Sequence, residues 1–434
     1  MKKILVAMHY MELGGAEAAL LGLLQSVDPE CAEVDVMIYS HQGELMHYLS
    51  EECGVRSEEC KLPRFHLLPE VEAYAMLERP IKEVMKKGYW GIALGRLLAK
   101  IPYKRDMKNN LKGLDNIATY HFIAEMVLPF LPKIQPKTEY DLAISFLLPH
   151  QYVLHKVRAK KKLAWLHTDY SKVYVSDKEE KVWSGYDYIG AISEDVGKGF
   201  SMRFPALKDK IFPIENILSS EFIRKRSEAP CPIFENETSL KLLTIGRYSY
   251  PKKMEDIPYL CRRLVEGISK SEELGVRNEE FPLKWYIIGY GSPEIEQQVR
   301  EEIAKEGMQE HVILLGKQSN PYPYIRTCDV YVQPSRYEGK SITVREAQIL
   351  CKPVIVTHYP TAPSQIGPTL SLPRREGTLV GQDGVIVPLE REACASAMIE
   401  VLRDKELLSS LSKYLSEHDY GNEAEIEKIY KLCE

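Results

Sequence analysis

Short apolar runs alternate with helical patterns from the start of the chain. The first run, Lys3–Met8, is followed by the glycines Gly14 and Gly15, by an amphipathic stretch and by a second apolar run, Val34–Tyr39. A buried strand, a glycine turn, a helix and another strand form a βαβ unit with its glycines at the helix entrance. Four further runs predict more buried strands in this half: Asp141–Phe146, Lys162–Leu166, Tyr188–Ile192 and Ile211–Pro213.

A second series of the same kind begins after Ser227–Ser239, a polar stretch with two prolines that is typical of a linker. Strands that alternate with helices predict parallel sheets covered on both faces, so we expect an α/β chain with two doubly wound, Rossmann-like domains. Ligands of such sheets bind beyond the carboxyl ends of the strands, which predicts a site in a central cleft that both domains face. This series has predicted strands at Leu240–Ile245, Leu283–Ile288, Val312–Leu315, Val330–Gln333 and Pro353–Thr357, and helices near Met254–Glu266, Ser292–Glu306, Tyr322–Cys328 and Ser341–Cys351.

The composition fits two globular domains and excludes some classes of protein. The chain has 434 residues, of which 44% are apolar, and a net charge of −5, so nucleic acid is not an expected partner. The nine cysteines are scattered without C-x-x-C spacing, which favours buried thiols in a reducing compartment over a zinc site or a redox motif. No apolar stretch is long enough for a transmembrane helix, and the first run is too short for a signal peptide.

One segment, residues 79–112, departs from the charge pattern of the rest. It holds ten Lys and Arg residues against two acids, Glu83 and Asp106. Apolar and aromatic residues are interleaved with these charges. Two interpretations stay open: a basic amphipathic surface that contacts an anionic membrane or a lipid-phosphate acceptor, or an ordinary solvated helix with an apolar core face.

The strongest local signal for chemistry is the stretch from Ser335 to Thr357. It contains two glutamates eight positions apart, Glu338 and Glu346, and a helix is predicted to start between them near Ser341. A helix start presents unpaired N–H groups and the positive end of the helix dipole, which suit a phosphate. We therefore expect one carboxylate beside each sugar of a nucleotide-sugar, although a solvated pair of glutamates on an ordinary βα unit has the same spacing.

This stretch resembles the E-x7-E element of the retaining GT-B glycosyltransferases, family 4 above all. Other elements of that family follow in the same order along the chain. The resemblance is dense in the C-terminal half and restricted to short segments in the N-terminal half. The further elements are Gly14-Gly15-Ala16-Glu17, Trp165 to Asp169, Ser193-Glu194, Pro213 to Asn216, Gly246-Arg247 with Lys252, and Gly289-Tyr290-Gly291.

The resemblance implies a role for each matching residue. Glu338 would bind hydroxyls of the transferred sugar, His167 would contact the donor sugar near the reacting carbon, and these two are the expected catalytic residues. Arg247 and Lys252 would hold the diphosphate, and fixed cations there would replace a metal ion. The remaining expected donor-binding residues are Gly14, Gly15, Gly289, Gly339, Lys340, Ser341, Ile342 and Glu346, the last through the ribose hydroxyls.

Three departures from the family pattern concern the donor more than the reaction. Lys340-Ser341 stands where the family has small or aromatic residues, and Lys253 and Cys351 stand where it commonly has glycine. The expected domains are 1–220 for the acceptor, with a basic insertion at about 79–113, and 235–410 for the donor. Residues 411–434, with a last helix at Glu423–Cys433, are expected to return to the N-terminal domain.

The resemblance implies a metal-independent enzyme that moves a sugar from a UDP- or GDP-sugar to a glycan or lipid-linked acceptor. It also implies a role in capsular or other surface polysaccharide assembly. The protein would be located in the cytoplasm or peripherally on the inner face of the plasma membrane. Retention of anomeric configuration rests on the family alone. An inverting GT-B enzyme and a catalytically silent nucleotide-sugar-binding subunit remain alternatives, whereas an oxidoreductase lacks the glycine fingerprint of a dinucleotide site.

Overall fold

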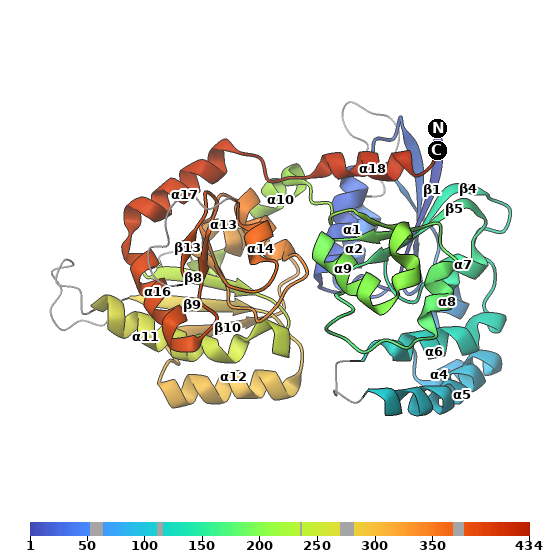
Figure 1. Ribbon diagram of the computed structural model, residues 1–434, viewed down its shortest axis with the longest axis horizontal. Helices are drawn as coiled ribbons and strands as arrows, with labels where there is room; N and C mark the ends of the chain where they lie inside the picture. The colour runs from blue at the N-terminus through green and yellow to red at the C-terminus, as the bar shows by residue number, and fades with distance from the viewer. Residues whose placement is uncertain (53–63, 111–115, 235–236, 270–281, 368–376) are drawn as a thin grey trace. The chain divides into compact units, whose positions relative to one another are not determined.

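The computed structural model describes residues 1–52, 64–110, 116–234, 237–269, 282–367 and 377–434. These residues form two compact units (Figure 1). Unit 1 comprises Met1–Ile217 together with Glu423–Glu434, and unit 2 comprises Leu218–Asn422. Unit 2 is therefore one continuous segment, and the chain leaves unit 1 and returns to it once.

Unit 1 is built on a seven-stranded parallel sheet. Its strand order is β3-β2-β1-β4-β5-β6-β7, so the direction of winding reverses between β1 and β4. The middle strands are apolar on both faces and buried, as both faces of a doubly wound sheet must be. The strands are β1 (Lys2–Met8), β2 (Ala32–Ile38), β3 (His66–Leu67), β4 (Tyr140–Ser145), β5 (Ala159–Leu166), β6 (Tyr188–Ala191) and β7 (Ile211–Pro213).

Helices link these strands, and the end of the chain returns to the same unit. The last helix, α18, is tied to the first strand, where Lys2 Nζ donates to the carbonyl of Tyr430 at 2.8 Å. It is also tied to the loop after α1, where the N–H of Asp28 donates to Tyr430 Oη at 2.9 Å. The helices are α1 (Gly15–Gln25), α2 (Met46–Glu52), α3 (Glu72–Ala75), α4 (Ile81–Lys86), α5 (Trp90–Asp106), α6 (Ala118–Val127), α7 (Gln151–Lys156), α8 (Glu179–Ser184), α9 (Glu194–Arg203) and α18 (Ile426–Lys431).

Unit 2 repeats the plan with a second seven-stranded sheet. Its order is β10-β9-β8-β11-β12-β14-β13, and winding reverses between β8 and β11. All its strand pairs are parallel except β13 with β14, an edge hairpin closed by the N–H of Gly381 on the carbonyl of Gly384. The strands are β8 (Leu240–Ile245), β9 (Leu283–Ile288), β10 (Val312–Gly316), β11 (Val330–Gln333), β12 (Val354–Thr357), β13 (Leu379–Val380) and β14 (Val385–Val387).

Two hydrophobic cores cover the two faces of this sheet. Neighbouring residues of one strand belong to different cores: Leu242 packs with the helices α11, α12, α16 and α17, and Leu243 packs with α10, α13 and α14. This alternation is the strand period of two, and it makes unit 2 a three-layer α/β/α sandwich. The helices are α10 (Ser220–Ser227), α11 (Ile257–Ser269), α12 (Pro293–Glu306), α13 (Tyr322–Thr327), α14 (Ile342–Ile349), α15 (Ala362–Gln365), α16 (Arg391–Arg403) and α17 (Lys405–Glu417).

The predicted fold class is confirmed, and all eleven predicted strands are present. The largest difference among them is at β5, which begins at Ala159 rather than Lys162. The β13–β14 hairpin and the short strand β3 had no counterpart in the prediction. Residues 411–422 lie in unit 2, so the return to unit 1 begins at Glu423 and not at 411.

The predicted linker is not where the units meet. The chain passes between them at Ile217 and Leu218, whereas most of Ser227–Ser239 packs within unit 2. Cys231 and Phe234 are buried in its core, with the ring of Phe234 4.6 Å from that of Tyr286. Polar residues and prolines indicated an irregular segment, but two apolar side chains are enough to anchor it to the sheet.

Hydrogen bonds tie the outgoing and returning chain together on each side of the passage. In unit 2 the N–H of Leu218 donates to Asn422 Oδ1 at 2.8 Å, and the N–H of Asn422 donates to the carbonyl of Leu218 at 3.3 Å. In unit 1 the N–H of Glu215 donates to Glu425 Oε2 at 3.1 Å. Both ends of unit 2 therefore lie side by side.

Candidate functional site

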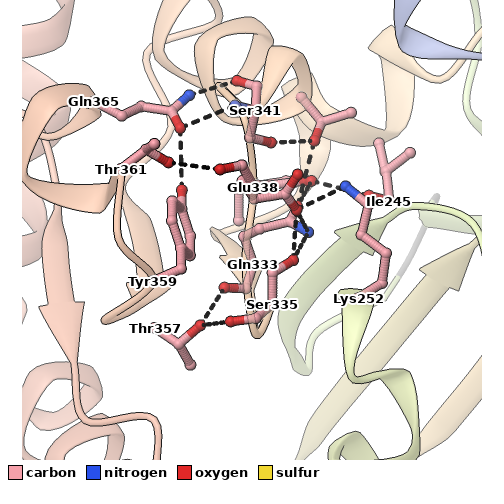
Figure 2. Close-up of polar contacts among 12 residues, drawn as sticks. Ile245, Lys252, Gln333, Ser335, Glu338, Ser341, Thr357, Tyr359, Thr361 and Gln365 are labelled. Atoms are coloured by element: carbon pink, nitrogen blue, oxygen red, sulfur yellow. Dashed lines mark hydrogen bonds and ion pairs between the residues drawn. The ribbon is translucent and has the colours of Figure 1, made fainter. Parts of the chain in front are cut away.

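The candidate site in unit 2 lies at the carboxyl ends of β8 and β11, the adjacent strands where the winding reverses. Gly246 and Arg247 follow β8, and a short 3₁₀ turn, Tyr250–Lys252, comes next. Ser335 and Glu338 follow β11 (Figure 2). Open α/β sheets bind their ligands at such a reversal.

Glu338 is the centre of a polar cluster drawn from several elements. Its Oε1 accepts hydrogen bonds from Lys252 Nζ at 2.7 Å, Gln333 Nε2 at 3.1 Å and Ser335 Oγ at 2.5 Å (Figure 2). The side chains of Lys252 and Glu338 are only 22% and 10% exposed. The structure thus brings two of the predicted site residues, 86 positions apart in sequence, into a direct and mostly buried ion pair.

A surrounding network fixes the side chain of Gln333, which sequence reasoning missed. Its Oε1 accepts from Tyr331 Oη at 2.7 Å and from Thr343 Oγ1 at 3.3 Å, so its amide Nε2 is turned toward Glu338. Gln333 is fully buried. A polar residue that ends an otherwise apolar strand was the available signal for it.

The start of α14 is held by Gln365 from the next βα unit. The N–H of Ser341 donates to Gln365 Oε1 at 3.1 Å, Gln365 Nε2 donates back to the carbonyl of Ser341, and Tyr359 Oη donates to the same Oε1 at 3.0 Å (Figure 2). Sequence reasoning assigned the N–H of Ser341 to the phosphate or the donor sugar. In the structure that N–H donates its hydrogen bond to Gln365. The contact joins two separate βα units, so no short-range sequence pattern could have indicated it.

Glu346 lies just over one turn into α14 and is buried, with 3% of its surface exposed. Its one hydrogen bond from the described part of the chain comes from Tyr322 Oη at 3.1 Å. Burial raises the pKa of Glu346 to about 7, and the bond from Tyr322 offsets only part of that rise. A buried carboxylate with a single neutral donor is poorly solvated, and ligand hydroxyl groups would supply the missing hydrogen bonds.

Arg247 differs from the other predicted site residues. Its side chain is exposed, and none of the described residues forms a hydrogen bond or ion pair with it. Arg336, which the sequence analysis did not single out, does form contacts with the described residues. Arg336 donates to the carbonyl of Tyr250 at 2.6 Å and pairs with Glu255 at 2.6 Å, so it ties the loop after β11 to the turn before Lys252.

The glycines at the ends of β8 and β9 allow two backbones to approach closely. A Cβ added to Gly289 would lie 2.0 Å from the carbonyl oxygen of Gly246. The N–H of Gly246 bonds to the carbonyl of Ile288, and that of Gly289 to the carbonyl of Gly316. The close packing of the strand ends therefore requires that Gly289 has no side chain.

Substituting Gly289 by alanine is expected to lower the free energy of unfolding by about 2–3 kcal/mol, because the new methyl group meets backbone that cannot move aside. Chemical denaturation measures the loss. Gly307→Asn is a suitable control, since an added Cβ there meets nothing within 4 Å and asparagine tolerates the positive φ of that position. Equal stability of Gly289→Ala and the parent chain would contradict this account of the strand ends.

Two residues that stand in place of family glycines adopt a left-handed backbone. Lys253 has φ 56° directly after Lys252, and Cys351 has φ 58° after α14. At Cys351 the turn is a Schellman motif, because the N–H of Lys352 bonds to the carbonyl of Ala347 and that of Cys351 to the carbonyl of Gln348. The departures from the family pattern change the side chains and keep the turn geometry.

In unit 1, His167 follows β5 and lies against two aromatic rings. Its ring centroid is 4.7 Å from that of Phe146, which follows β4, and 5.9 Å from that of Trp165. Burial lowers its pKa to about 3, so the imidazole is neutral. Its Nε2 is buried without a hydrogen-bond partner among the described residues, which suits a neutral donor or acceptor for a ligand hydroxyl.

The glycine loop of unit 1 forms the entrance to α1, as the sequence pattern predicts. Gly14 is the N-cap and provides no side-chain hydrogen bond, and Gly15 is the first helical residue. Glu17, in the first turn, is buried. The loop follows β1, beside the reversal of winding in this sheet.

Two further properties of the described ranges concern metal ions and membranes. No group of three or more His, Cys, Asp or Glu side chains within them could hold a metal ion. None of the helices they contain is long and apolar enough to cross a bilayer.

Comparison with known families identifies the C-terminal part of the chain. Residues 226–418 match the family model described as glycosyl transferases group 1. This region is similar to the group 1 glycosyl transferases. The predicted enzyme class and the predicted GT-B fold are confirmed at the level of family and fold, and the group 1 region contains every predicted site residue of unit 2.

The chain is also similar to individual proteins. The chain is 26% identical over 269 residues to an uncharacterized glycosyltransferase of Methanocaldococcus jannaschii, an alignment that covers 56% of the chain and 62% of the relative. Among solved structures it resembles S. aureus TarM, in a complex that contains UDP, with a TM-score of 0.64, 14% identity and all of both chains covered. It also resembles Anabaena HepE in complex with UDP and glucose, with a TM-score of 0.61, 13% identity and 99% of each chain covered.

Proposed function

We propose that this protein transfers a sugar from a nucleotide-sugar, a UDP- or GDP-sugar, to a hydroxyl of a glycan or lipid-linked acceptor, with retention of anomeric configuration and without a metal ion. The observation that carries the proposal is the cluster at the reversal of winding in unit 2. Two cations, Arg247 and Lys252, and the carboxylate of Glu338 follow the ends of the neighbouring strands β8 and β11. The second carboxylate, Glu346, lies in helix α14, which comes next in the chain, and both carboxylates are largely buried. The UDP in the TarM and HepE structures supports a uridine nucleotide as the first donor to test.

Each side chain has a role that its environment supports. Arg247 has an exposed guanidinium that no residue in the described ranges engages, which suits bidentate binding of the diphosphate. Glu346 would accept the ribose hydroxyls as an ionised carboxylate. Glu338 would accept hydroxyls of the transferred sugar. Lys252 holds its carboxylate in position until the diphosphate of the donor competes for the same ammonium group.

In the proposed reaction, the bond between the anomeric carbon and the β-phosphate oxygen breaks, and the acceptor oxygen bonds to the same face of that carbon. The acceptor proton passes to the leaving diphosphate oxygen, so no general base is required. The diphosphate gains negative charge as the bond breaks, and fixed cations stabilise this charge more in the transition state than in the ground state. His167, neutral over the ordinary pH range, would hydrogen-bond a substrate hydroxyl and not transfer a proton.

We assign donor binding to unit 2 and acceptor binding to unit 1, and we place the enzyme in family 4, in capsular or other surface polysaccharide assembly on the cytoplasmic side of the membrane. The family resemblance supports this placement. A curated relative named as a lipopolysaccharide core mannosyltransferase, from Rhizobium meliloti, matches 62 residues at 32% identity.

A panel of UDP- and GDP-sugars tests the proposal through thermal shift and release of the nucleoside diphosphate. We expect one donor to raise the melting temperature and to release its diphosphate only when an acceptor is added, with the anomeric configuration of the product, read by NMR, the same as that of the donor. EDTA should leave the rate unchanged. Binding without release under any acceptor would indicate a silent binding subunit, and an inverted product would indicate an inverting enzyme.

A further inference from the structure

Helix α5 in unit 1 exposes its large apolar side chains. Trp90, Leu94, Leu97, Leu98 and Ile101 are each between 44% and 61% exposed. They are five of the eleven large hydrophobic residues that are exposed in the described part of the chain. Their spacing of four, three, one and three residues puts all of them on one side of the helix. We call these five residues the α5 stripe.

The opposite side of α5 packs on α6, with small residues beside the buried Ile92. Gly95 and Ala99 are buried there, and a Cβ at Gly95 would lie 2.8 Å from the carbonyl oxygen of Met126. A Cβ at Gly91 would meet the ring of Phe130, which follows α6. An ordinary surface helix turns its large apolar side chains to the core. Here α5 and α6 lie side by side (Figure 1), and the glycines admit α6 at close range. The α5 stripe is on the exposed side of the helix.

The exposed charged residues of α5 all have one sign. Lys100, Lys104 and Arg105 are exposed, and their helical positions lie on or beside the stripe. The one acid of α5, Asp106, lies on another side, where its carboxylate accepts from Tyr174 Oη and Ser176 Oγ, both at 2.9 Å. In a chain of net charge −5, this surface is therefore both apolar and cationic.

We propose that the α5 stripe docks unit 1 on an anionic lipid surface, with its apolar side chains among the acyl chains and its cations at the phosphate groups. A helix with a lysine- and arginine-rich border and a tryptophan at one end suits the interfacial region of a bilayer. A second copy of the chain fits less well, because a two-fold contact would set the same lysines against each other. The inference goes beyond the proposed function and does not depend on it.

The tryptophans of the chain provide a direct reporter. There are four, and Trp165, Trp183 and Trp285 are fully buried, which leaves Trp90 as the exposed one. Vesicles of phosphatidylcholine with roughly one third phosphatidylglycerol are expected to shift the tryptophan emission of the full chain to the blue, and phosphatidylcholine alone to have little effect. Trp90→Phe should remove the shift. An unchanged emission spectrum with the anionic vesicles would contradict the insertion of Trp90.

Co-sedimentation with the same vesicles tests the two components separately. The pairs Leu97→Ser with Ile101→Ser, and Lys100→Glu with Lys104→Glu, are each expected to weaken binding at least about tenfold, and high salt should weaken the parent chain. Since all four residues are exposed, the variants should melt like the parent. Met202→Ser, which removes an apolar residue that is 78% exposed on α9, should bind normally.

Two results would overturn the proposal. One is failure of the parent chain to sediment with anionic vesicles, or sedimentation that neither pair of substitutions weakens. The other is a parent chain that is dimeric in solution without lipid and becomes monomeric in the Leu97→Ser, Ile101→Ser variant, which would identify the α5 stripe as a contact between copies.

Discussion

The Arg247→Ala variant is expected to lose about two to three orders of magnitude in kcat/KM with no change in melting temperature. The activity falls because the diphosphate loses a fixed cation that acts most strongly as the leaving group gains charge. The stability stays constant because Arg247 is exposed and has no hydrogen bond or ion pair with the described residues. Steady-state kinetics and a thermal melt of the same preparation measure both quantities.

Two controls sharpen this test. Arg247→Lys keeps the charge but not the fork of the guanidinium, so an intermediate loss is expected. Arg326→Ala removes an exposed arginine elsewhere in unit 2 and should leave the kinetics unchanged. Donor affinity and turnover of Arg247→Ala within about twofold of the parent chain would remove Arg247 from the proposed site.

Glu346→Gln is expected to stabilise the ligand-free protein at alkaline pH and to weaken donor binding. The pKa of Glu346 is raised by burial from 4.5 to about 7, so the folded state binds more protons than the unfolded state between these values. Stability therefore falls as pH rises through that window, by about 3 kcal/mol at most. Glutamine stays neutral and avoids this loss, so the variant should gain stability over the parent above about pH 7 and little below about pH 5.

Donor binding should become weaker in the same variant, although its stability increases. An ionised carboxylate is a stronger acceptor for ribose hydroxyls than an amide, so we expect Glu346→Gln to raise the Kd of the donor about tenfold to a hundredfold. Denaturant unfolding at several pH values and calorimetric titration of the donor measure the two effects. Glu310→Gln, an exposed carboxylate of unit 2, is the control. A stability difference that does not change with pH would contradict the burial of an ionisable Glu346.

The parts of the fold that sequence predicted well are those fixed by burial on both faces of a sheet. A run such as Val330–Gln333 is apolar up to its last residue because helices cover both sides of β11, and its bounds are the same in the structure. The predicted position of the passage between the units was wrong. Phe234 is a single buried ring, and the polar residues around it in the sequence give no indication of its burial. Side-chain identity was equally uninformative about the backbone of Lys253, whose positive φ only the structure shows.

The candidate site divides in the same way. Glu346 could be placed in a helix from its local pattern, and the structure places it there. The contact between Lys252 and Glu338 joins the ends of two strands that only the sheet order makes neighbours, so family resemblance alone suggested that they share a site. Gln365, which holds the N–H of Ser341, belongs to another βα unit and gave no signal in the sequence.

The hydrogen-bonded ends of unit 2 make it separable from the rest of the molecule. A fragment that begins at Leu218 and ends at Asn422 keeps both hydrogen bonds between its ends and both hydrophobic cores. It also keeps the strand ends that carry the polar cluster around Glu338. Its termini would start and stop beside each other, so it can also be circularly permuted or grafted as an insertion into a surface loop of a host protein. Such a portable module would allow the proposed nucleotide-sugar recognition to be studied in isolation.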